Sequence, residues 1–143
     1  MAAERTANVT WTGSLQEGSG RIESVGSGAF GPLDVTWEAR TEDSDGRTSP
    51  EELIAAAHAS CFSMAFSGGL AKAGTPPERL DVSATVTFVP GTGITKSALT
   101  VRGTVPGMDE AAFVEAAEVA KENCPVTQAL ASVPEITLDA SLA

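Results

Sequence analysis

The hydrophobic pattern of the chain is dominated by one stretch, residues 48–74, with the sequence TSPEELIAAAHASCFSMAFSGGLAKAG. No charged residue occurs within 53–71, and apolar side chains recur at three- and four-residue steps, which predicts a long helix. Ser49 and Pro50 are typical of a helix start, and Gly74 of a helix end. Because this helix is apolar on every side, we expect it to be buried on every side.

On either side of this helix, apolar and polar residues alternate, as in strands with one buried and one solvent-exposed face. Strands are predicted at 8–12, 20–25 and 33–38 before the helix, and at 80–88, 94–105 and 136–142 after it. The turn Pro90–Gly93 makes the first two of the later strands a β-hairpin. A second helix is predicted from an Asp109 cap to Cys124-Pro125, where a short helical turn begins. This order predicts an α+β fold in a single domain, residues 1–143, with antiparallel sheets around a long buried central helix.

Composition and charge narrow the range of functions. The net charge of −10, with nine unclustered Lys and Arg, argues against nucleic-acid binding. His58, serines and two glycines interrupt the longest apolar run, which favours a core helix over a membrane span. The N-terminal sequence MAAERTANVT lacks the apolar core of a signal peptide, so we expect a cytoplasmic protein. Two Cys and one His cannot close a four-ligand zinc site alone, so no metal is expected.

The two cysteines are the first candidates for chemistry. In a cytosolic chain, a pair of thiols indicates redox chemistry more often than a structural disulfide. Cys124 precedes Pro125 in the place of a helix N-cap, where free N–H groups lower a thiol pKa. Cys61 lies three turns inside its helix, where burial raises the pKa. Local sequence therefore makes Cys124 the more acidic thiol, with two inert buried thiols as the alternative.

Other groups could assist these thiols. His58 is one turn before Cys61 and could act as its base or its imidazolium partner, or be a hydrogen-bonded core or interface histidine. To be a nucleophile, Cys61 needs a cation supplied by the tertiary fold. Arg40, Arg21 and Arg47 are the plausible cations, with solvated surface arginines as the alternative.

The segments around both cysteines resemble the signatures of the OsmC/Ohr family of thiol peroxidases, the osmotically inducible and organic hydroperoxide resistance proteins. These segments are 49–65, SPEELIAAAHASCFSMA, and 123–128, NCPVTQ, and 135–139, EITLD, is similar to the family's closing strand. The likeness covers almost the whole chain in the same order. His58 is similar to the OsmC branch, since Ohr proteins usually carry an aromatic residue there.

The resemblance implies a reaction. It implies that Cys61 is the peroxidatic cysteine, whose thiolate attacks the O–O bond of an organic hydroperoxide and becomes a sulfenic acid. Cys124 would then resolve it as a disulfide, and a dithiol, characteristically a lipoyl group, would restore both thiols. An arginine would activate Cys61, with Arg40 as the best match and Arg21 as the runner-up, and Glu51 would hold that arginine. No flavin, haem, metal or other cofactor is implied.

The family resemblance therefore reverses the order of the thiols that local sequence indicates. It also implies an intertwined homodimer. Glu51 and Cys61 are ten residues apart, about 15 Å along a continuous helix, so we expect the Glu51 beside each Cys61 to come from the partner chain. Apolar side chains could surround the thiol and favour an alkyl or aryl hydroperoxide, or simply form the core. They are Phe62, Met64, Phe66, Ile54 and Phe30.

Two other functions remain open at this point. One is a non-catalytic dimeric module that binds apolar ligands or a partner and uses the Cys pair as a structural or sensing disulfide. The other is a hydrolase that uses His58 with Cys61, although the sequence offers no orienting acid and no oxyanion-hole motif for it.

Overall fold

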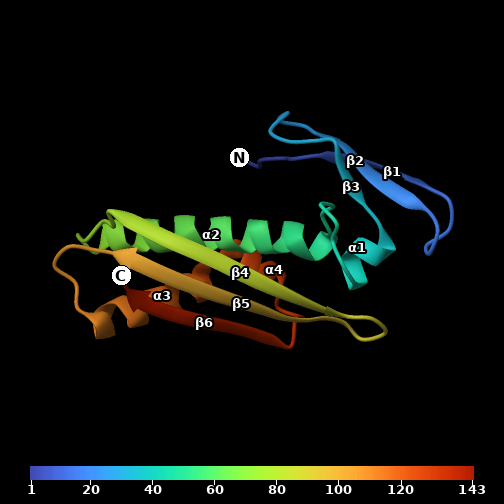
Figure 1. The fold of residues 1–143 in the computed structure, drawn as a ribbon. Coiled ribbons are helices and arrows are strands. Elements are labelled where there is room, and N and C mark those ends of the chain that lie inside the picture. Colours follow the sequence, from blue (N-terminus) through green and yellow to red (C-terminus); the bar gives the residue numbers. More distant parts are fainter. The chain divides into compact units, whose positions relative to one another are not determined.

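The structure, a computed structural model, describes all 143 residues as two compact units, Met1–Pro50 and Glu51–Ala143. In the first unit, strands β1 (Ala7–Thr12), β2 (Ser19–Val25) and β3 (Leu33–Val35) form an antiparallel sheet in the order β1-β2-β3 (Figure 1). A short helix, α1 (Trp37–Thr41), follows the sheet. The three strands that alternation predicted before the long helix are therefore present.

The third of these strands is shorter than predicted. It ends at Val35 instead of residue 38, because Thr36 caps a helix: its Oγ1 accepts a hydrogen bond from the Ala39 N–H at 3.0 Å. Trp37 thus opens α1 and does not continue the strand's alternation. Arg40, two residues beyond the predicted end of this strand, consequently lies in the last turn of α1.

The second unit contains most of the long helix, a sheet and two further helices. Helix α2 (Pro50–Lys72) is followed by β4 (Arg79–Val89), β5 (Gly93–Thr104), α3 (Glu110–Asn123), α4 (Pro125–Ala129) and β6 (Glu135–Leu142). The sheet has the order β4-β5-β6, and α2 and α3 lie on one face of it (Figure 1). The predicted hairpin, second helix and closing strand are confirmed. However, β6 pairs with β5 in parallel, which the helical crossover through α3 and α4 allows.

The core of this unit lies between the sheet and the two long helices. Phe66 on α2 packs against Phe62, with ring centroids 5.6 Å apart, and against Phe113 on α3, with centroids 5.1 Å apart. Leu99 and Val101 on the central strand β5 are also buried in this cluster. The core therefore holds α2 and α3 against β5 and fixes the turns of α2 that precede Phe66.

Two helix ends follow the predicted chemistry. Gly74 ends α2 with a positive φ of 87°, and the neighbouring Thr75 N–H donates to the Leu70 carbonyl at 2.9 Å. Asp109 caps α3, because its Oδ1 accepts from the Ala112 N–H at 2.8 Å. The Asp109 cap sets the start of the helix that leads to Cys124.

Burial of α2 on every side is not what the single chain shows. Within the second unit only one stripe of the helix is fully buried, at His58, Phe62, Phe66 and Leu70, while Met64 is 73% exposed. By length and composition alone α2 could cross a membrane, but a core helix passes the same test. The stripe's packing against β5 and α3 marks α2 as a core helix of this unit, with an apolar face left open.

Candidate active site

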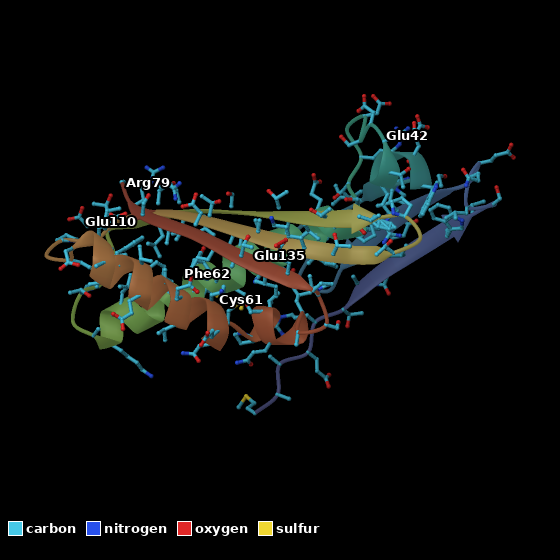
Figure 2. The ribbon with its side chains drawn as sticks, turned by 90° about the horizontal axis from the view of Figure 1, so that it is seen from below. Glu42, Cys61, Phe62, Arg79, Glu110 and Glu135 are labelled. Atoms are coloured by element: carbon cyan, nitrogen blue, oxygen red, sulfur yellow. The ribbon has the colours of Figure 1, made fainter.

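The two cysteines lie close together in the second unit although they come from different elements. Cys61 is in the middle of α2 and half-buried, and Figure 2 shows it on the side of the unit where α3 and α4 lie. Cys124 is fully buried at the junction between α3 and α4. Both are free thiols, and the ionisation of each depends on the other. The fold thus brings together two reduced sulfurs that are 63 positions apart in the sequence.

The pair shifts the acidity of its two members in opposite directions. Burial, and then the interaction with Cys124, raises the pKa of Cys61, and the Val126 N–H offsets this only in part. Burial also acts to raise the pKa of Cys124, but the Cys61 S–H and the N–H and hydroxyl of Thr127 favour its thiolate, so its pKa is lowered overall. The pair therefore favours a Cys61 thiol that donates toward a Cys124 thiolate.

The direction of these pKa shifts agrees with the prediction from local sequence that Cys124 is the more acidic thiol, and it adds a second cause, the interaction with Cys61. Cys124 is the N-cap of α4, and the N–H groups of Val126 and Thr127 favour its negative charge even though its sulfur makes no well-aligned capping hydrogen bond. The larger favourable contribution is the thiol of Cys61, which no local pattern could supply. Tertiary structure thus strengthens the preference that the helix start creates.

His58 is fully buried, and hydroxyl groups contact both of its ring nitrogens. Nδ1 lies 2.7 Å from Ser97 Oγ on β5, and Nε2 lies 2.8 Å from Thr127 Oγ1 on α4. Burial lowers the pKa of His58, so the imidazole is neutral at neutral pH. Since hydroxyls engage both nitrogens, His58 is the hydrogen-bonded core histidine of the two interpretations that the sequence allowed, and it is not a direct partner of Cys61. A hydrolase based on that pair therefore loses its base.

The charged site residues predicted from the sequence lie in different units. Glu51 is buried in the first turn of α2, 6% exposed, on the same continuous helix as Cys61. Arg40 is in the first unit, where its guanidinium lies 5.8 Å from the centre of the Trp37 ring. Arg21 in the same unit makes an exposed ion pair with Asp34 at 3.9 Å. The second unit by itself therefore contains the thiol pair and Glu51 but neither of the two arginine candidates.

A groove beside Cys61 offers space for a small molecule. Its volume is about 580 Å³, and its lining is mostly apolar, with Lys72 as the one charged residue. The other lining residues are Cys61, Met64, Ala65, Gly68, Gly69, Asn123 and Pro125. Of the apolar residues expected around the thiol, Met64 lines this groove, whereas Phe62 and Phe66 are core residues. No group of three or more His, Cys, Asp or Glu side chains is placed to hold a metal ion.

Two residues of the site were missed by sequence reasoning. Ser97 lies on the buried face of β5 together with Leu99 and Val101. A polar residue among the apolar positions of a predicted strand could have indicated a buried hydrogen-bonding role. Thr127 is three residues after Cys124, the N3 position of a helix whose N-cap is the thiol. That spacing brings an N3 side chain back toward the N-cap residue.

A reduced thiol pair with one member beside an apolar groove is the arrangement that a thiol-dependent oxidoreductase needs. A sequence profile of the OsmC-like protein family matches residues 41–139. The chain is 40% identical over 145 residues to peroxiredoxin OsmC of Escherichia coli, covering 99% of each chain, and matches peroxiredoxin OsmC of Shigella flexneri equally well. The chain therefore belongs to the OsmC-like family, and it is an enzyme of the peroxidase type.

Solved structures agree with the fold. The chain matches an organic hydroperoxide resistance protein from Elizabethkingia anophelis with a TM-score of 0.73 and 22% identity over 100% of both chains. It matches the organic hydroperoxide resistance protein OhrB of Bacillus subtilis with a TM-score of 0.69 and 21% identity, covering 96% of this chain and 98% of the other. The predicted α+β fold of the OsmC type is thereby confirmed.

Proposed function

We propose that this protein reduces organic hydroperoxides with Cys61 as the attacking thiol and Cys124 as the resolving thiol. The Cys61 thiolate attacks the O–O bond, the alcohol leaves after taking up a proton, and Cys61 becomes a sulfenic acid. The Cys124 sulfur then displaces hydroxide, which leaves as water, and a Cys61–Cys124 disulfide forms. The observation that carries this proposal is that two free thiols, from α2 and the α3–α4 junction, interact with each other while Cys61 lines an apolar groove.

The proposed order of reaction requires a cation near Cys61. In the single chain the shared proton favours Cys61, so a positive charge is needed to move it to Cys124 and leave a Cys61 thiolate. We assign this charge to Arg40 and its support to Glu51, whose carboxylate would hold the guanidinium. Arg21 is the weaker choice because it is exposed and already paired with Asp34.

The groove beside Cys61 supports an organic substrate. Its lining is mostly methyl, methylene and backbone surface from Met64, Ala65 and the glycines of α2, which an alkyl or aryl group can cover favourably. Hydrogen peroxide has no such group and gains nothing from this surface. A dithiol that reduces the disulfide needs the same access, and a lipoyl group, with its short hydrocarbon arm, suits an apolar groove.

A homodimer that shares its two active sites agrees with two observations. First, α2 is continuous from Pro50, so Glu51 lies ten residues from Cys61, which is about 15 Å along the axis. Second, the chain leaves apolar surface uncovered at Met64 on α2, and at Val9 and Trp11 on β1, where every residue is exposed. A partner that covers these surfaces would also bring its own Glu51 to the Cys61 of this chain.

We further propose that both units work as one domain, residues 1–143, in the cytoplasm. The proposed site supports this because its arginine lies in the first unit and its thiols lie in the second. The cytoplasm is where free thiols stay reduced and where a dithiol reductant can regenerate them.

Titration of the reduced protein with one equivalent of cumene hydroperoxide tests the chemistry. We expect the loss of both thiols and a mass lower by two hydrogen atoms, as the disulfide forms. Cys124→Ser should stop at a Cys61 sulfenic acid that a dimedone adduct reveals. Retention of both thiols in the wild-type protein would refute the peroxidatic role of Cys61 and favour a binding module. Hydrogen peroxide in place of cumene hydroperoxide should react more slowly.

Mixing two inactive variants tests the shared site. Glu51→Gln and Cys61→Ser should each be inactive as homodimers. A mixed dimer contains one site with an intact Cys61 and the other chain's intact Glu51, so co-refolded mixtures should regain activity. If Glu51 serves the Cys61 of its own chain, no mixture regains any. Met64→Glu should weaken the dimer in analytical ultracentrifugation, whereas Val89→Glu, at another exposed apolar position, should not.

A further inference from the structure

The proposed peroxidase cycle leaves one buried polar network without a role. His58 is fully buried in α2, and its two nitrogens lie 2.7 Å from Ser97 Oγ and 2.8 Å from Thr127 Oγ1. A buried imidazole with two hydroxyl partners could be purely structural. Its position relative to the thiols, however, gives it a chemical use.

His58 and Thr127 form a pair that runs parallel to the pair of cysteines. On α2, His58 comes one turn before Cys61, and at the start of α4, Thr127 comes one turn after Cys124. Residues three positions apart are neighbours on a helix surface. His58 contacts Thr127 across the two elements, and Cys61 interacts with Cys124 in the same way. The Thr127 hydroxyl therefore contacts the imidazole at 2.8 Å and also helps to lower the pKa of Cys124.

We propose that Thr127 and His58 form a path that takes the proton from Cys124 when Cys124 attacks the Cys61 sulfenic acid. This inference rests on the proposed function, because it concerns the second half of that cycle. Cys124 S–H gives its proton to Thr127 Oγ1 as Thr127 O–H gives its own to His58 Nε2. The new S–S bond forms while the Cys61 S–O bond breaks. The displaced hydroxide needs one proton to become water. His58 has taken up one proton from Cys124, so the protons balance.

The hydrogen bonds of His58 suit both states of this path. The two contacts fit either tautomer of His58. In the proposed path, Nδ1–H donates to Ser97 Oγ and the bare Nε2 accepts from the Thr127 hydroxyl before the transfer. After it, both N–H groups donate, one to Ser97 and one to Thr127. The Ser97 hydroxyl can accept in both states, which matches the tautomer whose Nε2 lone pair faces Thr127.

The proton path is needed at one particular point in the cycle. When Cys61 attacks the peroxide as a thiolate, the proton that the pair shares must be on Cys124. Once Cys61 is a sulfenic acid, its S–H no longer stabilises a Cys124 thiolate. Cys124 is fully buried, so at neutral pH the loss of this proton to solvent is slow. A proton acceptor within the protein speeds this step, and Thr127 with His58 is the candidate.

Few charged groups compete for this role. From β5, His58 faces Ser97, and from α4 it faces Thr127, neither of which is charged in this range of pH. Burial is the one cause of the pKa shift of His58, so the titratable groups of the network are His58, Cys61 and Cys124. The neutral imidazole that results from burial is the form that can accept a proton.

A single-turnover experiment on Thr127 variants tests the proposal. The reduced protein is mixed with cumene hydroperoxide, and samples quenched with acid are assayed by mass for sulfenic acid and disulfide. At about pH 6.5 we expect Thr127→Val to slow disulfide formation about 100-fold. Thr127→Ser should retain a rate within a few-fold of the wild type, because it keeps the hydroxyl. His58→Gln should slow the same step, since its amide is a much weaker base.

The pH profile separates a proton path from a merely structural role. At about pH 9.5, above the ordinary pKa of a thiol, Cys124 ionises without help, so the rate of Thr127→Val should approach that of the wild type. A rate lowered equally at every pH would mean that Thr127 only positions α4, and the proposal would fail. A Thr127→Val rate equal to the wild type at pH 6.5 would also overturn it. Failure of the underlying peroxidase function looks different, because no sulfenic acid would form in any variant.

Discussion

The hydrogen bond between Ser97 and His58 should contribute measurably to folding, and Ser97→Ala tests this. Ser97 is fully buried and its Oγ lies 2.7 Å from Nδ1. Without the hydroxyl, Nδ1 is left buried with no partner, and the ring cannot turn away because Nε2 is bound to Thr127. An unsatisfied buried polar group costs about 1–3 kcal/mol. The folding equilibrium constant should therefore fall by a factor of about 5 to 150, at 1.4 kcal/mol for each factor of ten.

Urea unfolding followed by circular dichroism measures this loss. The protein concentration must be constant, because self-association adds to apparent stability, and a reductant must be present so that no disulfide forms. Ser83→Ala is the matched control, since Ser83 is on the exposed face of β4, and it should change the free energy of unfolding by less than about 0.5 kcal/mol. If Ser97→Ala costs no more than this control, the buried His58 does not depend on Ser97 and our account of the network is wrong.

Three further perturbations test other parts of the structure. Burial lowers the pKa of His58 from its ordinary 6.5, so below that pH the unfolded chain binds a proton that the folded chain does not. The free energy of unfolding in urea should then fall more steeply below pH 6.5 in the wild type than in His58→Gln; equal slopes would contradict this. Phe66→Ala should lose about 3–5 kcal/mol in the same assay, whereas Val119→Ala at an exposed position should lose little; similar losses would contradict the assigned core. Asp109→Ala removes the N-cap of α3 and should lower thermal stability by about 1 kcal/mol, with Asp109→Ser recovering most of it; an unchanged melting temperature would refute the cap.

The regular elements could be predicted because each carries its own periodic signal. The alternation of β4 holds from Leu80 to Phe88, and the structure shows the same alternation in burial. The long helix was bounded by Pro50 and Gly74, and it ends within two residues of the predicted stop. The error at Trp37 arose because alternation continued past Thr36, where a hydroxyl that caps a helix outweighed it. Short elements offer too few residues for periodicity to compete with one local hydrogen bond.

The site was only partly predictable, because its chemistry depends on contacts between distant segments. Both cysteines were identified from the sequence, and a helix N-cap correctly indicated the acidity of Cys124. The partners of His58 were not identified from the sequence. Ser97 and Thr127 are 39 and 69 positions away from His58, and no local pattern specifies that their elements lie next to α2. The parallel pairing of β6 with β5 has the same origin. Periodicity indicates which face of a strand is buried, but it does not indicate which strand pairs with it.

The acidities of the two thiols bear on why the proposed reaction needs a group from outside the second unit. Within the second unit the pKa of the buried Cys124 is lowered and the pKa of Cys61, the thiol that borders the groove, is raised. Such a pair is stable but reacts slowly with a peroxide, because the accessible sulfur is the protonated one. A cation at Cys61 reverses the arrangement, and it does so only while the rest of the site is assembled around it. The proposed shared site would therefore limit attack to the folded dimer, after which the Thr127–His58 path removes the proton that this reversal has left on Cys124.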